Sequence, residues 1–351
     1  MELSNIIFSF ILLIFGFFLN KYALKLLKVK NKNLFIDDDY RKPQAFHTNK
    51  VYRLGGTTSF FLLLLSSLYL FYTKNIYLSE YIPFCSACFI LGLMDDLKIK
   101  ILPKFRLFAM TVILLALIIS NELYIKKSGL EFLNHLLAID IFAVCFVALC
   151  FLFIINGSNL IDGFNGLLSI HTVIILIILL VINLIGENDE ISIFLFYLIL
   201  IVLIFLKFNF PKAQMFLGDS GSYFLGALIS ISVIKTSGLN PGIPPFFFCT
   251  LLSYLFFEVF FSFFRKIFVA KQSPLLPDNK HLHMHLYKFL LKKNKSKLNS
   301  NYSVSLYING VYLLLLFPTF VFIQNGEFCR IYFFILLTLY IYFYKKLSKK
   351  N

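Results

Sequence analysis

The sequence predicts an all-α membrane protein, a polytopic transmembrane helix bundle with about eleven spans. Of its 351 residues, 59% are hydrophobic and only 15% are charged, whereas a soluble domain carries about 25% charged residues. The apolar residues form long runs such as 139–155 and 194–206, and a helix needs about 20 such residues to cross the hydrocarbon. A membrane barrel is excluded because barrel strands alternate apolar and polar residues, and these runs do not.

Each expected span is an apolar run that ends at charged or polar residues. The expected spans are approximately residues 4–20, 55–73, 78–94, 105–121, 137–155, 167–186, 191–206, 221–236, 244–264, 304–323 and 328–344. The third and the eighth are short and contain Gly or Pro, so their ends are the least well defined. Lys21 follows the first span where a signal peptide would have a small-residue cleavage site.

The positions of the basic residues predict the orientation of the bundle. All of the 33 lysines and arginines except Lys74, Lys126, Lys127, Lys235 and Arg330 fall in one alternating set of loops. That set is 21–54, 95–106, 156–166, 207–220, 265–303 and the tail 345–351. The positive-inside rule places it in the cytoplasm, with the N-terminus outside and the C-terminus inside. The net charge of +15 therefore lies beside anionic lipid headgroups, and we expect membrane lipid, not nucleic acid, as the partner.

Four polar clusters fall on this cytoplasmic side, and the first is the carboxylate pair Asp95 and Asp96. Two carboxylates with substrate phosphates are a usual arrangement for Mg²⁺, and Lys104 and Arg106 follow closely enough to hold phosphate. The alternative is a solvated pair that caps a turn. The pair alone favours that alternative.

The second cluster, residues 156–166, is rich in Asn, Asp and Gly. Its glycines allow close approach of the backbone to a ligand, and Asn and Asp side chains suit a base or a ribose. An ordinary turn-rich loop remains an alternative.

The third cluster, residues 216–222, opens the eighth span. A Gly- and Ser-rich turn at a helix N-terminus offers backbone N–H groups to phosphate. Asp219 would oppose an anion there unless a metal ion lay between them. Capping of the helix by Asp219 and Ser220 is an equal alternative.

The fourth cluster holds His281, His283 and His285. These side chains would bind zinc if the segment were extended, or phosphate if they were protonated, and the alternative is a solvated basic loop. Glu258 lies inside the ninth span, two helical turns before Arg265, so the two share a helix face. Together the clusters predict a metal-dependent phosphoryl-transfer site at the membrane surface.

Five motifs in order extend this interpretation: RKPQAFHTNKVYRLGG, GLMDDLKIK, NGSNLIDGFNGL, FLGDSGSYFLG and PDNKHLHMHLY. The set resembles the polyprenyl-phosphate N-acetylhexosamine-1-phosphate transferase superfamily, glycosyltransferase family 4, and its WecA-type branch in particular. The resemblance runs over most of the chain and implies one integral membrane transferase domain, 1–351, with its active site on the five cytoplasmic loops. It also implies a multi-pass protein of the bacterial inner (cytoplasmic) membrane and makes a homodimer an expectation.

The resemblance assigns roles to four carboxylates and a lysine. Asp95 is the candidate base that deprotonates the lipid phosphate, Asp96 is its acidic neighbour, and Lys104 fits the basic position that follows. Asp162 lies in the loop that lines the nucleotide-sugar site. Asp219 is the principal Mg²⁺ ligand, with Asp96 as the second, and Mn²⁺ is an alternative metal.

The remaining candidates bind substrate by the same resemblance. They are His47, Arg53, Asn156, Asn159, Asn209, Arg265, His281 and His283. The family reaction joins undecaprenyl phosphate to the β-phosphate of a UDP-sugar and releases UMP, as the first membrane step of a surface glycan such as O-antigen or capsule.

The chain departs from the family pattern in two places. His285 is displaced by one position from the usual histidine motif, and Asn165 stands where many relatives carry Asp, which puts the choice of sugar in doubt. Two alternative functions stay open. One is the phospho-N-acetylmuramoyl-pentapeptide transferase of peptidoglycan synthesis. The other is a transporter or flippase, which would keep its ionisable residues near mid-membrane.

Overall fold

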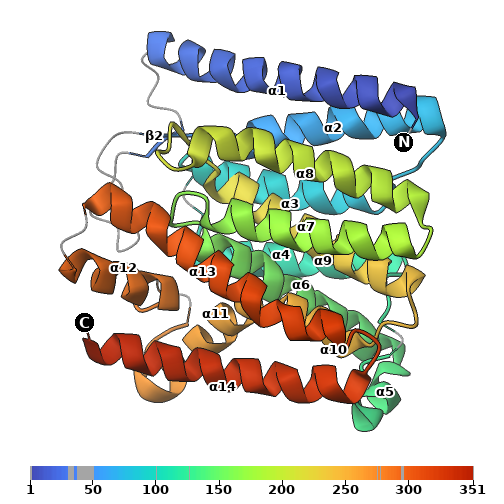
Figure 1. Ribbon diagram of the computed structural model, residues 1–351, viewed down its shortest axis with the longest axis vertical. Helices are drawn as coiled ribbons and strands as arrows, with labels where there is room; N and C mark the ends of the chain where they lie inside the picture. Colours follow the sequence, from blue (N-terminus) through green and yellow to red (C-terminus); the bar gives the residue numbers. More distant parts are fainter. Residues whose placement is uncertain are drawn as a thin grey trace.

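The computed structural model describes residues 2–30, 35–37, 51–99, 101–125, 127–274, 276, 278–293 and 296–350. Within these ranges the chain is a bundle of helices whose long members run side by side (Figure 1). The two termini lie at opposite ends of the bundle (Figure 1).

The structure confirms the prediction of an all-α bundle. The helices are α1 (Leu3–Lys30), α2 (Gly55–Lys74), α3 (Tyr81–Asp96), α4 (Pro103–Ser120), α5 (Glu131–Leu137), α6 (Asp140–Ile161), α7 (Leu167–Ile185), α8 (Asp189–Asn209), α9 (Gly218–Leu239), α10 (Pro245–Leu251), α11 (Ser253–Phe264), the π-helix η1 (Arg265–Val269), α12 (Leu282–Lys292), α13 (Lys297–Val321) and α14 (Gly326–Lys350).

The number of spans differs from the expected eleven. Every expected span coincides with a helix, but only nine helices of the described residues are long and apolar enough to cross a membrane, or ten if α10 and the helix after it form one span bent by 73°. Helix α3 has 16 residues, about 24 Å at 1.5 Å per residue, which is less than the ~30 Å hydrocarbon thickness. The short length of α3 therefore explains why it is not counted, although the apolar run 78–94 does form a helix.

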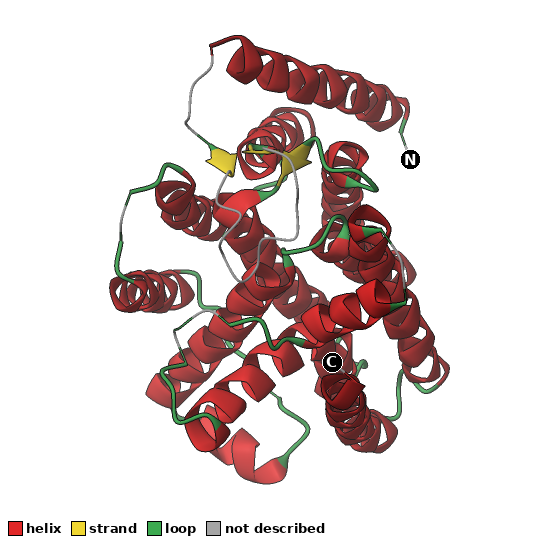
Figure 2. Cartoon of the chain, turned by 90° about the vertical axis from the view of Figure 1, so that its left-hand side faces the viewer, coloured by secondary structure: helices red, strands yellow, loops and turns green. Residues whose placement is uncertain are grey.

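Three very short strands join distant segments at one end of the bundle (Figure 2). They are β1 (Ile36–Asp37), β2 (Val51–Arg53) and β3 (Met215–Phe216). β2 pairs antiparallel with β1 and parallel with β3, with Arg53 opposite Phe216. The sequence did not predict these strands, because two or three residues in a polar segment carry no periodic signal. Their effect is to hold the start of α2 against the start of α9.

Helix α9 occupies the centre of the bundle, packed by α3, α6, α2 and α7, and most of its side chains are buried. Close packing depends on small residues. The backbone N–H of Gly56 donates to the Leu217 carbonyl at 2.8 Å, and a Cβ on Gly56 would overlap the backbone of Gly221. The first turn of α9, which contains Asp219, is therefore fixed in place by its neighbours.

Candidate active site

The carboxylate of Asp96 binds the N-terminus of α9. Its Oδ1 accepts the backbone N–H of Asp219 at 3.0 Å, and its Oδ2 accepts the N–H of Ser220 at 2.9 Å. Gly218 makes this approach possible: its φ is +80°, and a Cβ there would lie 2.6 Å from Asp96 Oδ2. A carboxylate at a helix N-terminus is stabilised by the free N–H groups and the helix dipole.

This contact corrects one expectation. The sequence suggested that the N–H groups at the start of this helix bind phosphate, but those of Asp219 and Ser220 already donate to Asp96. These two N–H groups are therefore not available to a phosphate. Asp96 itself is buried and holds the first turn of α9 in position.

Arg53, the last residue of strand β2, lies beside the carboxylate of Asp96. Its Nη1 lies 3.5 Å from Asp96 Oδ1, and pairing of β2 with β3 explains why it arrives there. About a fifth of the Arg53 side chain is exposed. His47, the other substrate-binding candidate of this segment, lies outside the described residues.

Asn159 joins α6 to Asp219. Its amide donates to Asp219 Oδ1 at 3.1 Å and to Ser222 Oγ at 3.0 Å. Asn159 and Asn156 were expected in a loop, but α6 continues to Ile161. Asn156 donates to the carbonyl of Leu152 within its own helix, at 2.7 Å, so the structure brings only Asn159 to the carboxylates.

Asp162 follows the last residue of α6 and completes a group of three carboxylates. Burial raises the pKa of Asp162 well above its usual range, and the negative charges of Asp219 and Asp96 raise it further, while Arg53 opposes them. Mutual repulsion of this kind favours a bound cation. No three His, Cys, Asp or Glu side chains of the described ranges are arranged to hold a metal by themselves, so a metal here would need oxygens from the substrate.

Asp95 and Arg106 form an ion pair beside this group. Arg106 also lies 5.5 Å from the centre of the Tyr223 ring, so its guanidinium is held between α3, α4 and α9. Lys104, the residue chosen from the sequence, is exposed near the start of α4. Among the described residues no ion pair joins Lys104 to a carboxylate, and Arg106 is the basic residue of α4 that pairs with Asp95.

Asn209, another substrate-binding candidate, forms hydrogen bonds with the backbone of two other segments. Its Oδ1 accepts the N–H of Gly166 at 2.6 Å, and its amide donates to the carbonyl of Met215 at 2.9 Å. Asn209 is buried at the end of α8. It therefore fixes the loop after Asp162 relative to the strand that leads into α9.

The histidines lie at the start of a helix, so the extended segment that the zinc alternative required is not formed. His281 precedes the first residue of α12, and His283 and His285 lie within it. Glu258 of α11 stands against the first two: its Oε2 is 2.9 Å from Nδ1 of His281, and its Oε1 is 3.4 Å from Nδ1 of His283. The two imidazole rings are stacked, with 5.4 Å between their centres.

A second ion pair orients His281 from the other side. Arg265 Nη2 donates to Asp278 Oδ2 at 2.7 Å, and Asp278 Oδ1 lies 3.4 Å from Nε2 of His281. Burial alone would raise the pKa of Asp278, but the hydrogen bond from Arg265 and the charge of His281 lower it overall. Asp278 is therefore a charged carboxylate between two groups that the sequence assigned to substrate binding.

Two of the histidines have a lowered pKa. Burial lowers the pKa of His283 despite the opposing charge of Glu258, and burial with the charges of Lys288 and Arg265 lowers the pKa of His285 to about 4. Both shifts favour the neutral imidazole over the protonated form. Nε2 of His283 is buried without a hydrogen-bond partner in the described structure, and such an atom is a natural contact for a ligand.

The carboxylate group and the histidine group lie side by side. Phe164, two residues after Asp162, packs against the His283 ring with 5.6 Å between centres. Tyr254, which the sequence analysis did not select, contacts His283 Nδ1 at 3.3 Å. Its position four residues before Glu258 on one helix was the signal for it.

Comparison with known proteins now identifies the family. Residues 80–237 match the model of glycosyl transferase family 4. The chain is 32% identical to an undecaprenyl-phosphate alpha-N-acetylglucosaminyl 1-phosphate transferase of Thermotoga maritima over 268 residues, 76% of this chain and 77% of the relative. It is also 32% identical to a probable undecaprenyl-phosphate N-acetylglucosaminyl 1-phosphate transferase of Bacillus subtilis, over 60% of this chain and 58% of the relative.

A relative from another branch matches as well. A phospho-N-acetylmuramoyl-pentapeptide-transferase of Dictyoglomus turgidum is 32% identical over 53% of this chain and 62% of its own length. The family match spans α3 to α9, the helices that carry the three carboxylates. The chain belongs to glycosyl transferase family 4, the superfamily of polyprenyl-phosphate hexosamine-1-phosphate transferases.

Proposed function

We propose that this multi-pass membrane protein transfers a sugar-1-phosphate, an N-acetylhexosamine-1-phosphate, from a UDP-sugar to undecaprenyl phosphate and releases UMP. The observation that carries the proposal is the group formed by Asp96, Asp162 and Asp219 with Arg53 at the N-terminus of α9. Asp96 is buried, and Asp162 and Asp219 are partly buried. Carboxylates that repel one another beside cationic side chains suit the binding of a metal and of diphosphate.

The donor set fits Mg²⁺, with Mn²⁺ as an alternative. Asp219 is the principal ligand that we assign. We assign Asp162 as the second ligand in preference to Asp96, because both carboxylate oxygens of Asp96 already accept backbone N–H groups. Mg²⁺ binds through one or two carboxylates plus substrate phosphates. When bound, the metal supplies positive charge that neutralises the diphosphate oxygens.

The reaction exchanges one phosphoanhydride for another. A phosphate oxygen of undecaprenyl phosphate attacks the β-phosphorus of the UDP-sugar, a new P–O bond forms, and the bond from the β-phosphorus to the bridging oxygen breaks, so that UMP leaves. We favour this direct attack over an aspartyl-phosphate intermediate, because it requires only that the two substrates be positioned.

We assign Asp95 and Arg106 to the lipid phosphate. Asp95 remains the candidate base. A phosphate monoester has a second pKa near 6, so most lipid phosphate is already fully ionised at pH 7, and removal of a proton contributes only to the remaining fraction. Arg106, paired with Asp95, attracts and orients the phosphate.

The histidine group holds the sugar end of the donor. Glu258 and Asp278 fix the ring of His281 from two sides, and Nε2 of His283 lacks a partner in the described structure. A neutral imidazole offers a hydrogen bond to a hydroxyl or to an acetamido group. Arg265, already paired with Asp278, adds positive charge close to the diphosphate.

We propose a UDP-N-acetylglucosamine-type donor first. The N-acetylglucosaminyl 1-phosphate transferase of Thermotoga maritima aligns with 76% of this chain, whereas the pentapeptide transferase of Dictyoglomus turgidum aligns with 53%. The product would begin a cell-surface glycan such as O-antigen or capsule at the bacterial inner membrane. A homodimer is the family expectation.

The test is UMP release by the purified protein in detergent, given undecaprenyl phosphate and a panel of UDP-sugars that includes UDP-N-acetylmuramoyl-pentapeptide. Release that requires both the lipid and Mg²⁺, and that stops with EDTA, is the expected result. Release with the pentapeptide donor alone would move the protein to the peptidoglycan branch. No release from a folded protein, together with transport of a lipid-linked sugar in proteoliposomes, would favour the flippase.

A further inference from the structure

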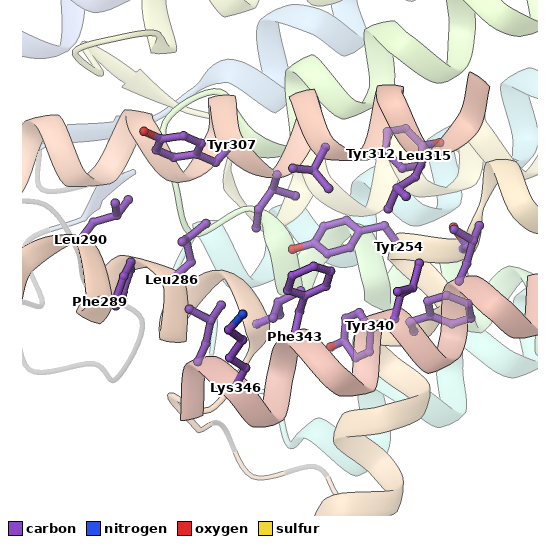
Figure 3. A pocket seen from close by; sticks show the side chains of 18 of the residues that line it. Tyr254, Leu286, Phe289, Leu290, Tyr307, Tyr312, Leu315, Tyr340, Phe343 and Lys346 are labelled. Carbon is purple, nitrogen blue, oxygen red and sulfur yellow. The ribbon is translucent and has the colours of Figure 1, made fainter. Parts of the chain in front are cut away.

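An apolar cavity of about 630 Å³ lies behind the histidine helix, between α11, α12, α13 and α14 (Figure 3). Leu286 and Phe289 of α12, Leu315 of α13 and Phe343 of α14 point into it (Figure 3). Cavities of this size hold a small molecule or part of a lipid chain. It is separate from the carboxylate group, none of whose members lines it.

Three lysines line the same cavity. They are Lys293, at the end of α12, and Lys346 and Lys350, one turn apart near the end of α14. Nζ of Lys293 lies 4.8 Å and Nζ of Lys350 lies 5.4 Å from the centre of the Phe289 ring, which places both ammonium groups at one end of the cavity. No acidic side chain is among the residues that line it.

This combination selects one class of occupant. We propose that the cavity binds an anionic membrane phospholipid, with an acyl chain among the apolar side chains and the phosphate at Lys293, Lys346 and Lys350. A small soluble anion would leave the apolar wall unused, and a zwitterionic lipid would gain little from three lysines. Juxtamembrane lysines attract anionic headgroups with about 1 kcal/mol each.

The site adjoins the histidine group through a shared wall. Tyr254 lines the cavity, and its hydroxyl contacts His283 Nδ1 at 3.3 Å. Leu282 and Leu286, on the same helix as His283, also line it. A lipid chain in the cavity therefore supports α12 from behind and fixes the position of His283.

Binding of phosphatidylglycerol to the full-length protein in neutral detergent, followed by native mass spectrometry, tests this proposal without the need for transferase activity. The variant carries Lys293→Gln and Lys346→Gln. At about 1 kcal/mol per lysine, or about fivefold in affinity, the pair weakens binding by about 25-fold. The matched control carries Lys345→Gln and Lys349→Gln, two exposed lysines of α14 outside the cavity lining, and binds within about twofold of the unmodified protein.

Equal binding by both double variants, or equal weakening in both, overturns the proposal, because the lysines of the cavity would then have no special role. Leu315→Trp, which narrows the cavity from its α13 wall and keeps every charge, is expected to weaken binding of phosphatidylglycerol. Phosphatidylcholine is expected to bind as weakly as phosphatidylglycerol binds to the lysine variant.

Competition decides between the phospholipid and the lipid substrate. Undecaprenyl phosphate at equal concentration is expected to leave bound phosphatidylglycerol in place. Its displacement there would make the substrate the occupant and the phospholipid assignment wrong. Photoactivatable phosphatidylglycerol should label peptides of α12, α13 and α14, and labelling spread evenly over all helices would also contradict the proposal.

Discussion

The backbone N–H of Asp219 donates to the carboxylate of Asp96 at 3.0 Å, so the end of α3 fixes the residue that we assign to the metal. Asp96 therefore acts as an anchor. Its position at the terminus of a short helix, against the most central helix of the bundle, accounts for the closeness of the acidic pair and the Gly-Asp-Ser turn.

Asp96→Asn is expected to lower both stability and rate. An amide presents one acceptor oxygen, so one of the two backbone N–H groups that Asp96 now satisfies would be left unpaired, at a cost of about 1–3 kcal/mol. Thermal unfolding in detergent measures the stability, and UMP release measures the rate. Asp189→Asn, at an exposed position at the start of α8, is the control, and an equal effect of the two changes would contradict the anchoring role.

Asp219→Asn is expected to abolish Mg²⁺-dependent turnover with little change in unfolding temperature. The side chain makes one hydrogen bond with Asn159, but the loss of its charge removes the principal metal ligand. Turnover measured over a range of Mg²⁺ concentrations checks this. A variant with normal turnover would remove Asp219 from the metal site.

Asp95→Asn is expected to slow turnover and to leave binding of the nucleotide sugar measurable. The change breaks the ion pair with Arg106, which orients the lipid phosphate, while the histidine group stays intact. Calorimetry with the UDP-sugar gives the binding constant, and UMP release gives the rate. Loss of nucleotide-sugar binding would place Asp95 outside the proposed lipid side of the site.

Glu258→Gln is expected to raise the KM for the UDP-sugar by roughly ten- to hundredfold. The charge-assisted contacts with His281 and His283 are worth about 1.5–3 kcal/mol, and 1.4 kcal/mol corresponds to a factor of ten. Glu190→Gln, exposed at the other end of the bundle, serves as the control. An unchanged KM in the Glu258 variant would show that the histidine orientation does not matter for the donor.

The pH dependence of stability should depend on His285. Burial lowers its pKa from 6.5 to about 4, so between these values the unfolded chain binds a proton that the folded protein does not. The free energy of unfolding therefore falls as the pH is lowered from 6.5 towards 4. His285→Asn should make the unfolding temperature less dependent on pH in that window. His135→Asn, exposed on α5, should leave the dependence as it was, and identical profiles for both variants would refute the assignment.

The sequence predicted the helices well because long apolar runs carry a strong signal. Its weakest result was the span count, since α3 is short and α10 and α11 are separated by a sharp bend. The strands β2 and β3 could not be predicted, because their pairing depends on contacts between residues more than 150 positions apart.

The sequence selected the acidic residues that meet in the structure, but it selected the basic residues less well. Asp96, Asp162, Asp219 and Asn159 meet as a group. Arg106 occupies the place expected for Lys104, a difference of two positions on a helix that a sequence pattern does not resolve. Asn209 and Asn156 were assigned to the site through the family resemblance, yet their amides donate to backbone carbonyls.

The fate of the β-phosphorus tests the central claim most directly. A UDP-sugar labelled with ³²P at the β-phosphate would be incubated with undecaprenyl phosphate, Mg²⁺ and the protein. Sugar-1-phosphate transfer places the label in the lipid product and leaves unlabelled UMP in solution. Label that stays in solution as UDP, while the sugar moves to the lipid, would contradict the mechanism and indicate transfer of the sugar alone.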